Sequence, residues 1–230
     1  MTIVNDSDVP ATFGAGGAEP YAAALQSTAA AAELYLHGPQ SARSPRRAAM
    51  NAGRWSAEAD HTDRSLLDGA AGPVLDIGCG PGRMVRAALD RGLAAVGVDV
   101  STTAVGIAVA AGLTVLNRSV FEPLPREGAW GTLLLVDGNI GIGGDPEALL
   151  RRCVALLGPA GELIVEVHGD PDHELVYQGT LEDSAGRRSD SFPWAEIGVD
   201  VLSIRAATVG LQLVQTWLLD GRSFARFARR

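Results

Sequence analysis

Three glycines and one aspartate in the stretch VLDIGCGPGR, residues 74–83, are the residues whose types and spacing best suit chemistry. Gly78, Gly80 and Gly82 lie two positions apart after an apolar run, so the backbone can turn tightly there and approach a ligand closely. Asp76 lies inside the apolar run itself. Because a buried carboxylate is costly without a partner, Asp76 predicts a ligand that brings positive charge.

A dinucleotide is the first ligand to compare with this turn. The motif G-x-G-x-x-G places a pyrophosphate at the N-terminus of the following helix, but Arg83 stands where the third glycine should be. Asp76 would also repel the pyrophosphate. S-adenosyl-L-methionine, in contrast, carries an ammonium group and a sulfonium. Asp99 ends the next apolar run and could accept hydrogen bonds from the ribose hydroxyls of either ligand.

The stretch DIGCGPG followed by GVDVS, within residues 74–101, resembles the class I S-adenosylmethionine-dependent methyltransferases of a small-molecule type. The resemblance implies an α/β, Rossmann-like, doubly wound sheet of seven strands in the order 3-2-1-4-5-7-6, with the last strand antiparallel. It implies that Asp76, Gly78 and Gly80 face the methionine end of S-adenosyl-L-methionine and that Asp99 holds its ribose. The other cofactor-binding positions that we predict from it are Cys79, Gly82, Val100, Ser119, Val120, Phe121, Asp137, Gly138 and Asn139.

The residues that follow two other predicted strands are candidates for catalysis. Methyl transfer from a sulfonium is an in-line displacement, and much of its rate comes from placing the nucleophile next to the methyl group. A general base helps when the acceptor is a hydroxyl, a phenol or a protonated amine. His168 and Asp137 are the catalytic residues that we predict, for an oxygen or a nitrogen acceptor. We predict no metal, because the loop residues His168, Asp170, Asp172 and His173 are of a kind that is usually solvated.

Two other functions stay open at this point. The fold could bind the cofactor without transferring a methyl group, or it could be a nicotinamide-dependent oxidoreductase, which the glycine spacing and Asp76 disfavour. Arg54 could anchor an acidic substrate or the methionine carboxylate. Aromatic side chains in the least regular segments could shape an acceptor pocket, namely Tyr35, Trp55, Tyr177, Phe192 and Trp194.

Alternating apolar runs and helical segments from residue 73 onward must position these side chains. The predicted strands are 74–77, 94–98, 113–116, 132–136 and 162–167, and the predicted helices are 82–91, 102–111, 146–157 and 199–209. Continuous Val, Leu and Ile runs between helices are typical of a parallel sheet that is covered on both faces. Asp145 and Pro146 mark a helix start, with Gly158-Pro159 at its end. Asp220-Gly221, between two alternating runs, predicts a terminal antiparallel hairpin.

The flanking segments are harder to interpret. Residues 1–56 are predicted to form an N-terminal tail and a helical cap, with an Ala-rich helix over 20–36, and residues 57–230 to form the cofactor-binding domain. A further helix is expected over 57–69, with Ser56 as its N-cap. Residues 168–198 are polar and too long for an ordinary connection, so we expect a substrate-side insertion or a mobile lid.

Composition limits the partners. The chain of 230 residues has a net charge of −8, which disfavours a nucleic-acid partner. It has two cysteines without metal-type spacing, an N-terminus unlike a signal peptide, and no apolar run long enough to span a membrane. We therefore expect a cytoplasmic monomer or homodimer that acts on a small molecule, with neither a membrane nor a nucleic acid as partner.

Overall fold

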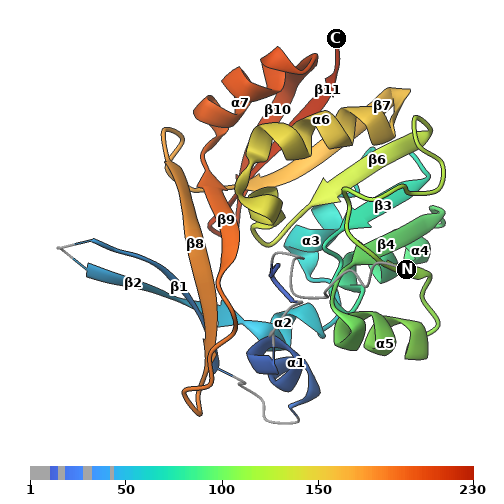
Figure 1. Cartoon of the computed structure of the whole chain (residues 1–230). Coiled ribbons are helices and arrows are strands. Elements are labelled where there is room, and N and C mark those ends of the chain that lie inside the picture. The colour runs from blue at the N-terminus through green and yellow to red at the C-terminus, as the bar shows by residue number, and fades with distance from the viewer. Residues whose placement is uncertain (1–10, 15–18, 28–32, 42–43) are drawn as a thin grey trace, which may run out of the picture.

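Two β-sheets build the part of the chain that the computed structural model describes, which is residues 11–14, 19–27, 33–41 and 44–230. A seven-stranded sheet carries helices on both faces, and a four-stranded antiparallel sheet, at the left in Figure 1, stands beside it. No helix among these described residues is long and apolar enough to cross a membrane.

The seven-stranded sheet has the predicted topology. Its strands are β3 (Val74–Ile77), β4 (Ala95–Asp99), β5 (Val115–Asn117), β6 (Trp130–Leu135), β7 (Leu157–Val167), β10 (Leu211–Leu219) and β11 (Arg222–Arg229). Their order is β5-β4-β3-β6-β7-β11-β10, which confirms the order 3-2-1-4-5-7-6. β11 runs antiparallel to both of its neighbours, and Asp220-Gly221 forms the turn before it, as predicted. The chain leaves β3 toward both sides of the sheet, so the carboxyl ends around β3 are where a ligand is expected.

Helices cover both faces of this sheet. They are α3 (His61–Ser65), α4 (Arg83–Asp90), α5 (Thr102–Ala110), α6 (Pro146–Leu156) and α7 (Val199–Thr208). The start of α6 is confirmed: the Asp145 side chain accepts a hydrogen bond from the Ala148 amide, and Pro146 is the first helical residue. Gly158-Pro159, expected just after the helix, already belong to β7.

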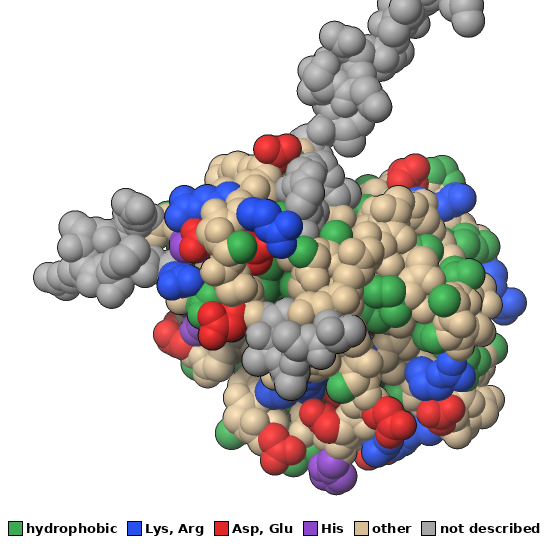
Figure 2. Space-filling model, turned by 90° about the horizontal axis from the view of Figure 1, so that it is seen from below, with side chains coloured by type: hydrophobic (Ala, Val, Ile, Leu, Met, Phe, Trp, Pro, Cys, Tyr) green, Lys and Arg blue, Asp and Glu red, His purple; other side chains and the backbone are tan. Residues whose placement is uncertain are grey.

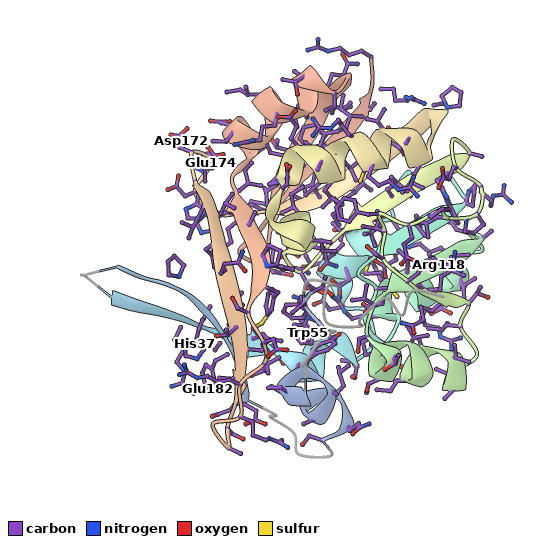
Figure 3. The ribbon with its side chains drawn as sticks, viewed as in Figure 1. His37, Trp55, Arg118, Asp172, Glu174 and Glu182 are labelled. Atoms are coloured by element: carbon purple, nitrogen blue, oxygen red, sulfur yellow. The ribbon has the colours of Figure 1, made fainter. Side chains whose placement is uncertain are left out.

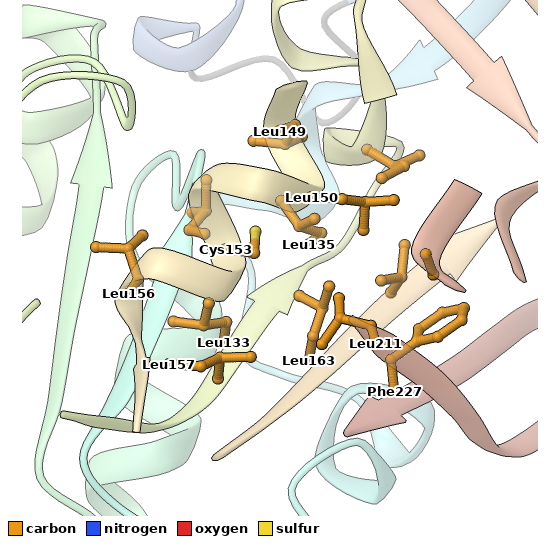
Figure 4. Close-up of a cluster of buried hydrophobic side chains, with 14 of the residues drawn as sticks. Leu133, Leu135, Leu149, Leu150, Cys153, Leu156, Leu157, Leu163, Leu211 and Phe227 are labelled. Atoms are coloured by element: carbon orange, nitrogen blue, oxygen red, sulfur yellow. The ribbon is translucent and has the colours of Figure 1, made fainter. Parts of the chain in front are cut away.

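The core between α6 and the sheet is built of leucines. Leu149, Leu150, Cys153 and Leu156 of α6 are fully buried against leucines of β6 and β7, as Figure 4 shows. Burying each leucine contributes roughly 1.5–3 kcal/mol, so this face holds α6 and the turn before it firmly in place.

The N-terminal helices are shorter in the structure than in the prediction. The helix expected over 20–36 is only α1 (Glu19–Gln26); residues 28–32 lie outside the described part, and Glu33–Ser41 is a strand, β1, paired with β2 (Ser44–Asn51). Helix propensity is a weak prior, and strand pairing overrides it here. The helix expected over 57–69 is limited to α3.

The residues that cap α3 also differ from the prediction. Asp60, not Ser56, is the N-cap, and it exchanges hydrogen bonds with Asp63 in a capping box. Ser56 instead ends a short helix, α2 (Ala52–Trp55). The helix predicted over 57–69 is therefore shortened to α3, and α2 lies before the predicted range.

Residues 168–198 are ordered into strands rather than an irregular insertion. They form β8 (Glu174–Asp183) and β9 (Phe192–Ile197), and the small sheet has the order β2-β1-β8-β9. Leu36 of β1 faces Leu181 of β8, so segments from both ends of the chain share one sheet. Its inner face packs on α1 and looks toward the carboxyl ends of the large sheet.

Candidate cofactor and acceptor site

A cavity of about 870 Å³ lies at the carboxyl ends of the central strands, between the two sheets. Most predicted cofactor-binding residues line it: Asp76, Gly78, Cys79, Gly80, Asp99, Val100, Ser119, Val120, Phe121, Asp137 and Asn139. Gly82, Gly138 and His168 are not among its lining residues. Residues predicted from the ends of four strands, β3, β4, β5 and β6, are thus brought together, as expected for an open parallel sheet.

The glycine turn after β3 needs its glycines for two different reasons. Gly78 has φ +69°, and a Cβ there would lie 2.7 Å from Nδ2 of Asn139, which donates hydrogen bonds to the carbonyl oxygens of Ile77 (2.8 Å) and Gly78 (2.9 Å). A Cβ on Gly82 would lie 2.4 Å from Cδ1 of Leu113. Gly78 therefore permits contact with the turn after β6, whereas Gly82 permits close packing away from the cavity.

Asp76 is buried in the cavity floor, with an exposed fraction of 3%. Burial raises the pKa of its carboxyl group to about 7, although the Arg83 guanidinium acts in the opposite direction. No hydrogen bond joins the Asp76 side chain to any other residue of the described segments. A cationic group bound next to this carboxylate would offset the cost of its burial.

Asp99 points into the same space from the end of β4. Its carboxylate accepts hydrogen bonds from the backbone amides of Gly80 (2.8 Å) and Ser101 (2.8 Å). Burial raises the pKa of Asp99, while these backbone donors lower it. Asp99 therefore links the glycine turn to the start of α5, where Ser101 is the N-cap.

Phe121 lies on the β5 side of the cavity as part of its wall. Its side chain is 45% exposed and reaches the backbone of Gly143, with ring carbon Cε2 3.1 Å from the position of a Cβ there. The Phe121 amide donates to Oγ of Ser119 at 3.2 Å. Because an exposed ring beside a cavity can stack on a flat ligand, this arrangement suits the predicted adenine position.

Asp137 belongs to a cluster of ion pairs at the edge of the cavity. Its carboxylate pairs with Arg83, with Arg222 (3.4 Å) and with Arg54 (3.8 Å), and burial raises its pKa against the lowering effect of Arg83. Its backbone amide donates to Glu166 at 2.7 Å. Proton transfer to this carboxylate would break its ion pairs with the guanidinium groups, so the geometry suits Asp137 to positioning.

Asp63 joins three arginines at the centre of this cluster. It is fully buried and pairs with Arg83, Arg54 (2.8 Å) and Arg222 (2.8 Å). Burial opposes its ionisation, but hydrogen bonds from Arg83 and Arg222 lower the pKa of Asp63 to about 2. Nε of Arg83 and Nε of Arg54 remain buried without a hydrogen-bond partner among the described residues.

The Arg83 side chain offers a donor to a ligand. Arg83 lines the cavity and is 6% exposed, so its unpartnered Nε–H lies in a region from which water is largely excluded. The sequence predicted Arg54 as the anchor for a carboxylate. Arg83 was not predicted, because in the sequence it is an ordinary first residue of a helix.

His168 lies outside the cavity, stacked on His173 with ring centroids 3.8 Å apart. Its Nδ1 accepts a hydrogen bond from the Asp170 amide at 3.1 Å. In this position His168 does not reach the lining residues. Its predicted role as general base therefore lacks geometric support.

The same histidines do not build a convincing metal site. His168, His173 and Glu196 bring ligand atoms within 4.8 Å of one another, and Asp170 and Asp172 are not part of this group. Because Nδ1 of His168 accepts a hydrogen bond, the neutral ring carries its proton on Nε2, the atom that would have to bind the ion. Asp172 lies just before β8, away from Trp55 (Figure 3).

Aromatic side chains form the wall opposite the central strands. Of those predicted, Trp55 and Trp194 line the cavity, whereas Tyr35, Tyr177 and Phe192 do not. The structure adds Phe13 and Tyr21, which sequence reasoning missed. Burial, followed by the charge of Asp99, raises the pKa of Tyr21 well above its ordinary value.

The glycines after β6 bring the two sheets into contact. A Cβ on Gly141 would lie 2.3 Å from the carbonyl oxygen of Ala195, and one on Gly144 would lie 2.9 Å from Cβ of Pro193. The turn Asn139–Gly144 therefore packs directly on β9. Gly141 and Gly144 allow this close contact, whereas Gly143 of the same turn lines the cavity.

Charge on the outside gives no sign of a nucleic-acid surface on the face seen in Figure 2. Acidic and basic side chains are interspersed there, over a surface of mixed polarity.

Comparison with known proteins agrees with this geometry. A family model described as "Methyltransferase domain" matches residues 52–199. No protein with a curated description matches the chain at a significant level.

Solved structures share the fold at low sequence identity. An S-adenosylmethionine-dependent methyltransferase from Bacteroides fragilis, in complex with S-adenosyl-L-homocysteine, has a TM-score of 0.74 at 19% identity, covering 95% of this chain and 98% of that one. The CcbJ methyltransferase from Streptomyces caelestis gives 0.55 at 15% identity, over 76% and 92%. The Burkholderia thailandensis 1,6-didemethyltoxoflavin-N1-methyltransferase gives 0.54 at 19%, over 74% and 77%.

Proposed function

The chain belongs to the methyltransferase-domain family and is an S-adenosylmethionine-dependent enzyme of the class I fold, and from this we infer that it methylates a small molecule. The observation that carries the inference is the cavity itself. It joins Asp76, the glycine turn and Asp99 at one end to an aromatic wall at the other. Its volume of about 870 Å³ lies within the range of small-molecule sites.

The residues present fit the cofactor. Asp76 forms no ion pair among the described residues and would pair with the methionine ammonium group. Asp99 would accept from the ribose hydroxyls in place of the Gly80 amide. The unpartnered Nε–H of Arg83 suits the methionine carboxylate. Ser119, Val120 and Phe121 would contact the adenine.

Nitrogen is the nucleophile that the cavity favours. When bound, the cofactor supplies a methyl group on a sulfonium; the acceptor's lone pair attacks that carbon while the carbon–sulfur bond breaks, leaving S-adenosyl-L-homocysteine. A neutral nitrogen needs no base for this attack, unlike a hydroxyl group. No histidine lines the cavity among the described residues, and Asp137 is ion-paired.

The named acceptors of similar structures support the same proposal. Didemethyltoxoflavin is the acceptor named for the Burkholderia protein, and another neighbour is described as a sugar N-methyltransferase from Streptoalloteichus, with a TM-score of 0.51 at 16% identity. Both names describe methylation of small molecules at nitrogen. At such identities they support the proposal only by analogy.

Calorimetry with S-adenosyl-L-homocysteine tests the site. We expect clear binding that weakens about 100-fold in Asp99→Ala, because charge-assisted hydrogen bonds to the ribose are lost. Asp68→Ala, which removes an exposed carboxylate paired with Arg91 and absent from the lining of the cavity, is the control and should leave affinity unchanged. No binding of either S-adenosyl-L-methionine or S-adenosyl-L-homocysteine at millimolar concentration would refute the proposal. Tight binding without product formation on any amine would favour cofactor binding without methyl transfer.

A further inference from the structure

Phe13 occupies the middle of a group of aromatic rings at the acceptor end of the cavity. Its ring centroid lies 5.2 Å from that of Tyr21, 6.2 Å from Trp55, 5.5 Å from Phe192 and 5.2 Å from Trp194. We call these four surrounding side chains the aromatic slot. Three contacts are edge-to-face and the one with Trp194 is tilted by 34°, and separations of about 4.5–7 Å are favourable for aromatic pairs.

The wall around the slot carries no charged side chain in the part of the chain that the structure describes. The cavity-lining residues supplied by segment 11–14, α1, β2, α2 and β9 include no Asp, Glu, Lys, Arg or His. Met50, Pro193 and Ile142 of the turn after β6 complete this apolar surface. A charged acceptor group placed here would lose its hydration without gaining a partner, so the part of the acceptor that enters is uncharged.

The slot lies next to the expected position of the reactive group. Oη of Tyr21 is 3.4 Å from the position of a Cβ on Gly80, the residue expected to face the methionine end of the cofactor. Tyr21 is therefore shared by the cofactor end and the aromatic slot. A ring that fills the slot lies beside the methyl group to be transferred, which is the placement that an in-line displacement requires.

Phe13 is less buried than three of the four aromatic residues around it and lies outside the helices and main strands. Tyr21, Phe192 and Trp194 are buried in α1 and β9, whereas Phe13 is half-buried and belongs to the short segment Ala11–Gly14. This segment passes over the cavity, and Gly14, at φ +84°, packs against Ser101 and Tyr21. Removing one half-buried ring costs less than removing a fully buried one.

We propose that the methyl acceptor is a planar, uncharged aromatic or heteroaromatic molecule whose ring takes the place of Phe13 in the aromatic slot. Phe13 fills the slot in the absence of the acceptor and keeps water out of it. The inference rests on the proposed function for its reaction, but the slot itself can be tested without turnover. Phe13 competes with the ligand for the slot. The apparent affinity is therefore the affinity of the empty slot multiplied by the fraction of molecules in which Phe13 lies outside it.

Calorimetry with indole, in the presence of saturating S-adenosyl-L-homocysteine, measures the competition. We expect weak binding to the unaltered protein, about tenfold tighter binding to Phe13→Ala because the slot is vacant, and no detectable binding to Trp194→Ala. Cyclohexylmethanol and indole-3-acetate should bind more weakly than indole, since one lacks an aromatic ring and the other brings a charge. Leu218→Ala, on an exposed surface of β10, is the control that should bind indole like the unaltered protein.

A second measurement avoids substitutions altogether. Hydrogen exchange of peptides covering residues 11–14 should rise when indole is added to the unaltered protein, because Phe13 is displaced. Unchanged exchange together with equal indole affinity in Phe13→Ala would overturn the proposal, as would equal binding of cyclohexylmethanol. These results are separate from those for the proposed function, because a protein that binds indole but not S-adenosyl-L-homocysteine keeps the slot and loses the methyltransferase reaction.

Discussion

At the scale of single residues, Asp76 is the most informative position. The sequence predicted it correctly as a buried charge beside a glycine turn, because a strand rarely carries a carboxylate without a ligand. Arg83, Tyr21 and Phe13 could not be found in the same way. Each has an ordinary local context, and its importance comes from neighbours far away in the chain.

The raised pKa of Asp76 predicts that cofactor binding releases a proton. In the free protein the pKa is about 7, against an ordinary 3.8, so the free fold loses stability as pH rises through this interval. The ammonium group of a ligand favours the carboxylate and lowers the pKa again. Near pH 6 we expect S-adenosyl-L-homocysteine binding to release close to one proton, and its affinity to weaken as pH falls from 8 to 5.

Calorimetry in buffers of different ionisation enthalpy measures this proton release. Asp76→Asn is the matched variant, because it keeps the shape of the side chain and removes its titration. Its binding should be weaker and free of the proton release near pH 6. If the asparagine variant still releases the same proton, Asp99 or Asp137, whose pKa values are also raised by burial, must be its source.

At the scale of elements, the large sheet was predictable and the small one was not. Apolar runs bounded by caps, such as Asp145-Pro146, and the Asp220-Gly221 turn are local signals. β1 and β8 stabilise each other, with Leu36 opposite Leu181. Neither strand could therefore be predicted from the sequence of its own segment. His168 shows a related limit: a strand end was predicted from the sequence, but not the direction of the side chain that follows it.

The ion-pair cluster around Asp63 joins α2, α3, α4 and β11. Removing its carboxylate takes the fully buried partner away from Arg54, Arg83 and Arg222 and leaves them to share Asp137. Asp63→Asn should therefore destabilise the fold by about 3–5 kcal/mol in urea denaturation. Asp68→Asn, which breaks an exposed pair with Arg91, should cost less than about 1 kcal/mol. Equal costs for the two variants would show that the cluster contributes nothing beyond a surface pair.

The sign of the pH effect at Asp63 follows from its lowered pKa. The folded value of about 2 lies below the ordinary 3.8, so this carboxylate stabilises the fold above pH 3.8. That contribution is lost as pH falls from 3.8 toward 2. The difference in stability between the unaltered protein and Asp63→Asn should shrink over the same interval.

At the scale of the whole molecule, the net charge of −8 affects how the cofactor arrives. S-adenosyl-L-methionine carries one net positive charge, whereas S-adenosyl-L-homocysteine carries none. Stopped-flow association of the first should therefore slow more than that of the second between about 10 and 150 mM salt, as screening shortens the reach of the protein's field. Identical salt dependence for the two ligands would contradict this expectation.

The contact between β9 and the turn Asn139–Gly144 also limits how the cavity can open. Gly141 and Gly144 let the two backbones touch, so the wall that carries Trp194 and the floor that carries Asn139 move as one body. The small sheet cannot swing away along that seam without breaking the contact. Segment 11–14, which supplies lining residues of the cavity, takes no part in this contact, so displacing Phe13 from the slot would leave the contact between the two sheets intact.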